Sequence, residues 1–304
     1  MGTINLEITN LTDLFHIQDG LKMSYPQTPV SSPYIYRGVG DEKYQLLPSI
    51  FRKVTHQYSD DEFMVVTNYK YLAHSTEKKV LQDFIAEAAG YIKDIPTTDF
   101  FRWAEYAQHF GAPTRLLDWT SNPLVALFFA CINAEDRDGA LWILHESNFR
   151  SYSLMNSQLG DEEKEKINKL SYKDMFNSIF SGSKQIVREY PVIYQPYYVD
   201  NRMGAQSSKL MFWGTRQEAL EEMIPQRNYL VIQNPDNGEY FNYGNQNQEV
   251  ILKLMVRKQV KQGILRQLEN VGVNYKTLFP GLDGIGKYIE HKYRFNYDEA
   301  SEYF

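Results

Sequence analysis

The spacing of apolar residues predicts a mainly helical N-terminal half that contains one early strand. Apolar positions recur at helical intervals over residues 11–23, 60–89 and 100–110, the second stretch with a break near Ser75. Residues 34–38, YIYRG, are aromatic and β-branched instead, which is typical of a short strand. We therefore expect several helices to pack on a sheet that includes this strand.

Beyond residue 138 the pattern changes to short β-prone runs. These are GALWILH, PVIYQPYYV, KLMFWG, NYLVIQ and EVILKLMV, and helical spacing returns over residues 258–273 and 278–293. Residues 147–184 are polar and charged, which indicates a helical surface insertion. No linker rich in Pro, Gly and Ser divides the chain. Residues 1–304 are thus predicted to form one α+β domain, with the helical half packed on a mixed, mainly antiparallel sheet.

Composition is typical of a folded globular protein. The chain has 304 residues, 43% of them apolar, and a net charge of −6, which argues against a general nucleic-acid binder because such proteins need a basic surface. The longest apolar run, residues 124–132, is too short to span a membrane, and no secretory signal is evident. The single cysteine, Cys131, lies in this run, where a thiol acts as a small hydrophobe. We expect a cytoplasmic protein without a membrane partner.

The stretch DWTSNPLVALFFACI, residues 118–132, places polar residues directly before a strongly apolar helix. Ser121 or Asn122 before a proline is a helix-start signature, because the side chain caps free amides and proline suits the first helical position. The N-terminus of such a helix favours a nearby phosphate or other anion, although the motif equally fits a structural cap without a ligand. Arg115 and Asp118 are expected to pair and to stabilise the loop.

Several blocks of the chain resemble the FRG domain family. They are YRG at 36–38, LLPSIFR at 46–52, AQHFGAPTRLLDWTSNPLVALFFA at 107–130, RMGAQSSKLMF at 202–212 and LFPGLDGIGKYI at 278–289. The family takes its name from the tripeptide, here with Tyr36 where Phe is usual, and the long central block is the most specific. Around Gln206 the chain departs from the family pattern, because Ser207 and Ser208 follow it. The family occurs largely in bacteria and their viruses, so the resemblance implies a role in bacterial stress or phage defence.

More distantly, the chain resembles ADP-ribosyltransferases. Those enzymes place an Arg on an early strand, a Ser-Thr-Ser-like strand before a helix, and a Glu at a late strand. This chain offers Arg37, then Thr120 and Ser121, then Glu249. The resemblance implies that Arg37 holds a phosphate of NAD and that Thr120 and Ser121 brace the nicotinamide ribose. It also implies that Glu249 binds a ribose hydroxyl while charge develops at the anomeric carbon.

Neighbouring side chains are predicted to help hold the nucleotide. They are Tyr36, Gly38, His109, Arg115, Trp119 and Gln206. The ring of Tyr36 or Trp119 would stack on the nicotinamide. Gln206 or Glu218 takes the place of Glu249 if the family register differs.

Other chemistries lack their motifs. The chain contains no GxSxG, HExxH or GxxxxGK[ST] pattern, and its six histidines are scattered, so no metal site is expected. Two hypotheses remain. The first is an NAD-using ADP-ribosyltransferase-like effector or NAD glycohydrolase, with a protein target or an antitoxin-like partner. The second is a non-catalytic module that binds a nucleotide or a protein partner in the same pocket.

Overall fold

The computed structural model describes residues 7–24, 33–52, 54–57, 65–68, 74–180, 188–198, 200–224, 232–233, 240–241 and 250–300. The helices are α1 (Leu11–Ser24), α2 (His74–Ala88), α3 (Phe100–His109), α4 (Pro123–Cys131), α5 (Glu146–Met155), α6 (Asp161–Asn168), α7 (Tyr172–Phe180), α8 (Asn201–Ala205), α9 (Leu220–Met223), α10 (Lys261–Asn270), α11 (Tyr275–Leu278) and α12 (Leu282–Ala300), with the 3₁₀ turns η1 (Ser49–Phe51) and η2 (Lys258–Val260). The strands are β1 (Tyr34–Val39), β2 (Val54–Gln57), β3 (Val65–Asn68), β4 (Leu116–Thr120), β5 (Gly139–His145), β6 (Val192–Tyr194), β7 (Ser208–Phe212), β8 (Ile232–Gln233), β9 (Tyr240–Phe241) and β10 (Ile251–Val256).

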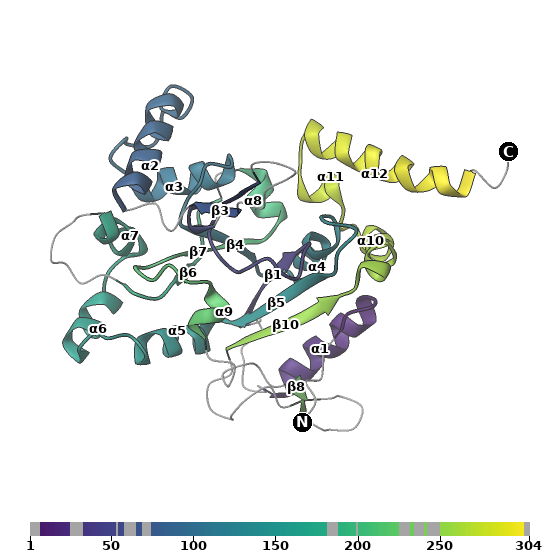
Figure 1. Ribbon diagram of the computed structural model, residues 1–304, viewed down its shortest axis with the longest axis horizontal. Coiled ribbons are helices and arrows are strands. Elements are labelled where there is room, and N and C mark those ends of the chain that lie inside the picture. The colour runs from purple at the N-terminus through teal and green to yellow at the C-terminus, as the bar shows by residue number, and fades with distance from the viewer. Residues whose placement is uncertain are drawn as a thin grey trace.

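Six of the strands form one antiparallel sheet in the order β10-β5-β1-β4-β7-β6 (Figure 1). β1 pairs with β5 along all of residues 34–39. On its other side β1 meets β4 at a single residue pair, Tyr36 and Thr120. The α+β class is confirmed, and the strand that carries YRG lies beside the strand that carries DWT.

Two groups of helices share one face of this sheet. Strand residues of alternating number point to the same face, and Tyr36 and Thr120 are opposite each other, so their side chains belong to one face. On it, α1, α4, α10 and α11 pack on β1, β5 and β10 through a core that includes Phe128. Next to them, α2, α3, α7 and α8 pack on β4, β6 and β7 around Phe212. The opposite face is covered by η1, α5 and α9.

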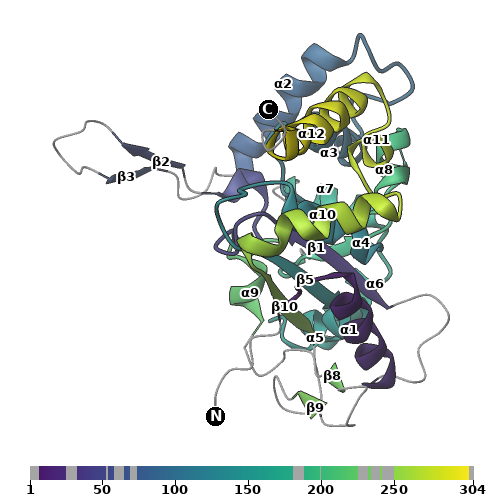
Figure 2. The ribbon, with the colours of Figure 1, turned by 90° about the vertical axis from the view of Figure 1, so that its right-hand side faces the viewer.

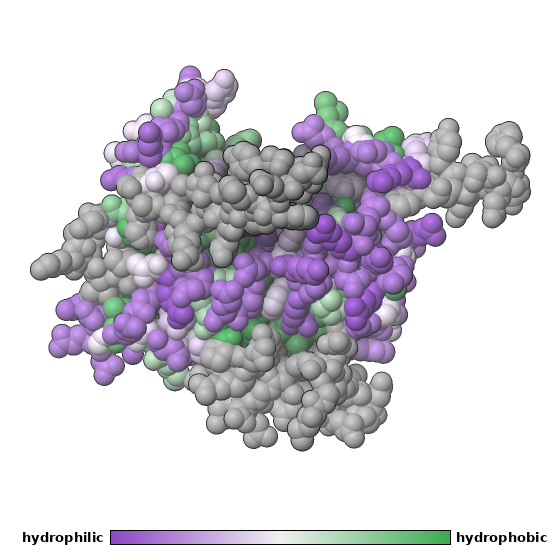
Figure 3. All heavy atoms as spheres, in the orientation of Figure 1, coloured by the Kyte–Doolittle hydropathy of each residue, from purple (hydrophilic) through white to green (hydrophobic). Residues whose placement is uncertain are grey.

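The views from outside agree with this layered arrangement. Figure 2 shows α10, α11 and α12 on one side of the sheet, and the hairpin of β2 and β3 standing away from the sheet. The face seen in Figure 3 is largely hydrophilic where residues are coloured. Among the described residues, each helix is too short or too polar to cross a bilayer.

The helix predicted over residues 60–89 is wrong in its first part. Residues 65–68 form β3, which pairs with β2, and the helix starts only at His74. The run VVTN is rich in β-branched residues, which favour a strand once a partner strand is available. Apolar spacing along the chain carries no information on such a partner.

Residues 146–180 fold into three helices beside β6 (Figure 1). α6 lies mostly in solvent, as its run of charges suggests. In contrast, α7 buries Met175, Phe176 and Ile179 in the core next to Phe212. This segment thus contributes to the hydrophobic core as well as to the surface.

Candidate functional site

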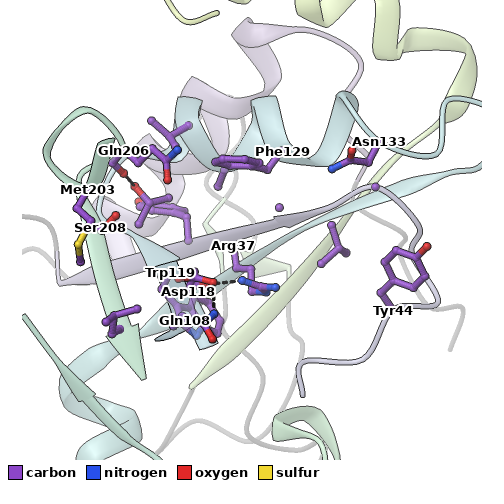
Figure 4. A pocket seen from close by; sticks show the side chains of 18 of the residues that line it. Arg37, Tyr44, Gln108, Asp118, Trp119, Phe129, Asn133, Met203, Gln206 and Ser208 are labelled. Atoms are coloured by element: carbon purple, nitrogen blue, oxygen red, sulfur yellow. Dashed lines mark hydrogen bonds between the residues drawn. The ribbon is translucent and has the colours of Figure 1, made fainter. Parts of the chain in front are cut away.

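A cavity of about 810 Å³ opens where β1 and β4 separate (Figure 4). α4 forms one wall, α3 and α8 form the opposite wall, and β4 and β7 lie between them. The loop after β1 closes one end with Lys43, Tyr44 and Arg52. The volume falls within the ~300–1,000 Å³ that small-molecule sites usually have.

Arg37 lies at the separation of the two strands. A continuing antiparallel ladder would place Gly38 opposite Asp118, but the pairing stops at Tyr36, and the Arg37 guanidinium donates to the Asp118 carbonyl instead (Figure 4). The Nε of Arg37 is buried and has no hydrogen-bond partner among the described residues. Burial lowers the pKa of Arg37 to about 10, a value at which the side chain is still charged at neutral pH. A half-buried guanidinium with a free donor suits an anionic ligand.

Gly38 allows α4 to approach β1. A Cβ at this position would lie 1.8 Å from the Ala126 carbonyl oxygen and 2.6 Å from the Ala130 nitrogen. Both are backbone atoms, so they cannot move aside as the end of a flexible side chain could. Gly38 lines the cavity, but the contact between the two elements is sufficient reason for a glycine here.

The helix start predicted between β4 and α4 is confirmed. Asn122, not Ser121, is the N-cap, and its side chain accepts a hydrogen bond of 3.0 Å from the Leu124 amide, with Pro123 at the first helical position. α4 is apolar on nearly every face, and burial raises the pKa of the Cys131 thiol to about 12. That cysteine is therefore a protonated core residue at neutral pH.

The hydroxyls of the junction hold β4 to the loop before β7. Thr120 Oγ1 donates to the Gln206 carbonyl at 2.6 Å and accepts from the Asn122 amide at 3.0 Å. Ser121 is exposed, and its hydroxyl lies 3.4 Å from the carbonyl of Ser207, a residue with positive φ. Thr120 and Gln206 line the cavity, whereas Ser121 stands outside its lining.

A hydrogen-bond chain orients the Asp118 carboxylate in the cavity. Gln108 Nε2 donates to Asp118 Oδ2 at 2.7 Å, and Gln108 Oε1 accepts from the Thr114 hydroxyl. The same hydroxyl accepts from the Leu116 amide at 3.1 Å, so the chain is anchored at the start of β4. Burial lowers the pKa of both Arg37 and Arg52, and the negative charge of Asp118 raises the pKa of each in the opposite direction.

Glu105, on α3, supplies a second and more unusual carboxylate. It is buried and lines the cavity, and its Oε2 makes no hydrogen bond within the described residues, although Arg102 Nε approaches to 3.5 Å. Burial raises the pKa of Glu105 to about 7, only partly offset by the charge of Arg102. The hydroxyl of neighbouring Tyr194 is also buried and interacts with the Glu105 carboxylate, and burial raises the pKa of Tyr194 strongly. A carboxyl group with this pKa can give or take a proton at neutral pH.

Two further polar side chains line the wall made by α3 and α8. His109 Nε2 lies 2.5 Å from Asp200 Oδ2. Arg202 places its guanidinium over the ring of Phe279, 4.5 Å from the centroid. Arg202 adds positive charge to this wall of the cavity.

The aromatic residues predicted to stack on a nicotinamide are unsuited to that role. Tyr36 is 1% exposed and Trp119 is 3% exposed, each packed in the core on its own face of the sheet. Both line the cavity, but the more accessible rings in its lining are those of Tyr44, which is 53% exposed, and Phe129, which is partly buried. Figure 4 shows Phe129 on the helix above Arg37 and Tyr44 to the right of Arg37.

The predicted pair of Arg115 and Asp118 is wrong. Arg115 is fully buried and forms its ion pair with Glu77 of α2, and it also donates to the carbonyls of Trp213 and Gly214. Arg115 immediately precedes β4, and its side chain belongs to the interior next to α2, whereas Asp118 faces the cavity. Arg115 is absent from the cavity lining, so the structure gives it a stabilising role instead of a contact with a nucleotide.

The late carboxylate stays a prediction. Glu249 lies outside the described residues. Of its two alternatives, Gln206 lines the cavity and donates from Nε2 to the Leu278 carbonyl at 3.0 Å. Glu218 is paired with Arg216 and lies away from the cavity lining.

Sequence patterns missed several residues of the cavity. They are Lys43, Tyr44, Arg52, Glu105, Gln108, Phe129, Asn133, Arg202 and Met203. One signal was available for Glu105, because its neighbours along α3 are apolar and aromatic residues that mark the buried side of the helix. Across the part of the chain that the structure describes, no three His, Cys, Asp or Glu side chains gather as a metal site would require.

Comparison with known families identifies part of the chain. Residues 32–139 match the family model described as the FRG domain, a segment that includes β1, α3 and the junction of β4 and α4. The resemblance of the YRG and DWT blocks is confirmed by this match, and the blocks at 202–212 and 278–289 lie beyond it. No curated protein and no solved structure matches the chain. The more distant likeness to ADP-ribosyltransferases stays a prediction.

Proposed function

We propose that the FRG domain of this chain binds NAD in the cavity between β1 and β4 and transfers ADP-ribose from it. The observation that carries the proposal is the position of Arg37 in the same cavity as Thr120. Arg37 is a charged, half-buried side chain with an unpaired Nε among the described residues. Four cationic side chains line this cavity against two carboxylates: Arg37, Lys43, Arg52 and Arg202 against Glu105 and Asp118. Such an excess of positive charge favours a ligand that carries a pyrophosphate.

The proposed reaction breaks the glycosidic bond of NAD. A nucleophile, either water or a side chain of a protein target, forms a bond to the anomeric carbon of the nicotinamide ribose. The bond to the nicotinamide nitrogen breaks, nicotinamide leaves as a neutral molecule with the electron pair, and the nucleophile loses its proton. With water the products are ADP-ribose, nicotinamide and one proton.

In this scheme the role of each described residue follows from its charge or from its aromatic ring. Arg37 and Arg52 hold the phosphates, and Tyr44 or Phe129 offers a ring face to a base. Glu105 stabilises the positive charge that develops on the ribose and accepts the proton of the nucleophile. The raised pKa of Glu105 supports its role as proton acceptor. The cationic nicotinamide ring of bound NAD favours the ionised carboxylate. When the positive charge of that ring disappears in the reaction, the carboxylate takes up a proton.

The experiment uses the full chain with NAD. Release of nicotinamide is followed by liquid chromatography, and ADP-ribose adducts on the chain and on bacterial lysate proteins are sought by mass spectrometry. Arg37→Met and Glu105→Gln are each expected to lower the rate by about a hundredfold or more. Arg137→Met is the matched control, because Arg137 is 59% exposed and pairs with Asp41 outside the cavity lining.

Two outcomes would contradict parts of the proposal. If Glu105→Gln keeps full activity while Glu249→Gln loses it, the catalytic carboxylate is Glu249. If the parent releases no nicotinamide and forms no adduct, the enzymatic hypothesis fails. The proposed role in bacterial stress or phage defence follows from the FRG match and is tested by the toxicity of the parent and of Arg37→Met in bacterial cells.

One observation favours the second hypothesis, a non-catalytic binding module. The Thr120 hydroxyl already donates to the Gln206 carbonyl and accepts from the Asn122 amide, so it has little capacity left for a ribose. A binding module would need Arg37 and the cavity but no carboxylate. Calorimetric binding of NAD that is lost in Arg37→Met and kept in Glu105→Gln, without any product, would establish this alternative.

A further inference from the structure

A second pocket, of about 250 Å³, lies between the helices of residues 146–180 and the edge strand β6. α5, α7 and β6 contribute to its lining, together with Arg188, which precedes β6 in the chain. Figure 1 shows these helices next to β6, at the far end of the sheet from β10. The pocket shares no lining residue with the cavity of Arg37.

Arg188 is a buried cation without an acidic partner among the described residues. It is 7% exposed and lines the pocket. Its Nη2 donates to the Ser153 hydroxyl at 3.2 Å, and that hydroxyl donates in turn to the Arg150 carbonyl at 2.8 Å. Its Nε is buried with no hydrogen-bond partner in the part of the chain that the structure describes.

The charges around Arg188 make an anionic ligand beside it more favourable. Burial lowers the pKa of Arg188. Arg150 also lines the pocket, and its positive charge lowers the pKa of Arg188 further. Among the described residues, the one carboxylate of the lining is Glu146, and it lies 3.4 Å from the ammonium group of Lys209. A buried charge is costly unless an opposite charge or several hydrogen bonds compensate for it.

The backbone of Arg188 is held in place by the loop after β7. Its carbonyl accepts from the Thr215 amide at 3.0 Å, and a Cβ on Gly214 would lie 2.2 Å from the same oxygen. This close approach requires a glycine at position 214 and ties Arg188 to the core. The guanidinium is thus presented to the pocket from a fixed backbone, as a binding site needs.

We propose that this pocket binds a phosphoryl group, either as inorganic phosphate or as part of a small phosphomonoester. Two guanidinium groups, those of Arg150 and Arg188, supply the donors that phosphate oxygens prefer, and the Asn168 amide adds a further hydrogen-bonding group to the lining. The volume lies below the ~300–1,000 Å³ of sites for larger ligands, so the pocket suits a small molecule and excludes a dinucleotide. This site is independent of the proposed use of NAD.

The test measures thermal stability and calorimetric binding of the full chain with inorganic phosphate and, separately, with glycerol phosphate, in sodium chloride of matched ionic strength. We expect both probes to raise the melting temperature of the parent. Arg188→Met should bind at least about tenfold more weakly and should melt no lower than the parent in phosphate-free buffer, because it removes an uncompensated charge. Arg150→Gln should also weaken binding. It should leave folding intact because Arg150 is exposed.

Arg137→Met is the matched control, since Arg137 pairs with Asp41 outside the lining of both pockets, and it should leave this response intact. The proposal is overturned if phosphate fails to stabilise the parent, or if it stabilises Arg188→Met and Arg150→Gln as much as the parent. It is also overturned if Arg37→Met alone loses the response, because phosphate then binds between β1 and β4. Tighter binding of glycerol phosphate than of inorganic phosphate identifies an ester as the ligand, and the reverse identifies the free ion.

Discussion

The ion pair of Arg115 and Glu77 is the residue contact from which we expect the largest effect on stability. The two side chains are 0% and 2% exposed, and Arg115 also donates to the carbonyls of Trp213 and Gly214 at 3.0 and 2.9 Å. Removing one partner leaves the other charge buried and unpaired. Arg115→Met and Glu77→Gln are each expected to lower the free energy of unfolding by about 3–5 kcal/mol, measured by urea denaturation.

An exposed pair on α6 provides the control for this measurement. Lys169 and Glu165 are separated by four residues, and both are about 70% exposed. Lys169→Met is expected to cost only about 0.3–0.5 kcal/mol, because water screens the pair. Similar losses for the buried and the exposed pair would contradict the stabilising role given to Arg115.

Glu105 is expected to make stability depend on pH. Burial raises its pKa from 4.5 to about 7, so the folded protein binds this proton more tightly than the unfolded chain does. The contribution of this group to stability therefore falls as the pH rises from 4.5 to about 7 and stays low above it. Glu105→Gln should remove that fall and be more stable than the parent at higher pH, by at most about 3 kcal/mol. Parallel curves of unfolding free energy against pH for the two proteins would refute the shift.

At the scale of elements, the contact between β1 and α4 determines the shape of the cavity. A Cβ at Gly38 would collide with backbone atoms of Ala126 and Ala130, so Gly38→Ala must push the helix away from the strand. We expect a loss of about 3 kcal/mol or more in unfolding free energy. Gly263→Ala on α10 is the matched control, because a Cβ there meets nothing within 4 Å, and it should gain up to about 1 kcal/mol. Equal stability of the two variants in chemical denaturation would show that α4 can move freely.

At the scale of the whole molecule, the folding unit extends well beyond the matched FRG segment. The match ends at residue 139, the first residue of β5, yet β5 pairs with both β1 and β10, and β4 pairs with β7. A fragment of residues 32–139 would lack these partner strands and much of each core. We expect it to show no cooperative thermal transition by circular dichroism and little dispersion in its amide NMR spectrum. A sharp transition would mean that the family segment folds alone.

Local sequence signals and the motif blocks predicted much of the element order and seven residues that line the cavity: Tyr36, Arg37, Gly38, His109, Trp119, Thr120 and Gln206. The cap and proline before α4, the amphipathic spacing of α3 and the β-branched run of β1 act within a few residues, so they can be recognised along the chain. The motif blocks likewise indicated that Arg37 and Thr120 belong to one site, and both line the cavity. The stacking role expected of Tyr36 and Trp119 stays a prediction, and the burial of both rings argues against it, because alternation along a strand decides which side chains are buried.

Only the tertiary structure decided which partner each polar residue has. Arg115 is three residues from Asp118, but it pairs with Glu77, 38 residues away, because the side chain enters the core next to α2. Glu105 has a raised pKa because the packing of α3 on the sheet removes water from it. The separation of β1 from β4 after one residue pair, which creates the cavity, is likewise a property of the assembled sheet. Capping and apolar periodicity act over one or two turns of chain, whereas burial, pKa and ion pairing depend on residues that only folding brings together.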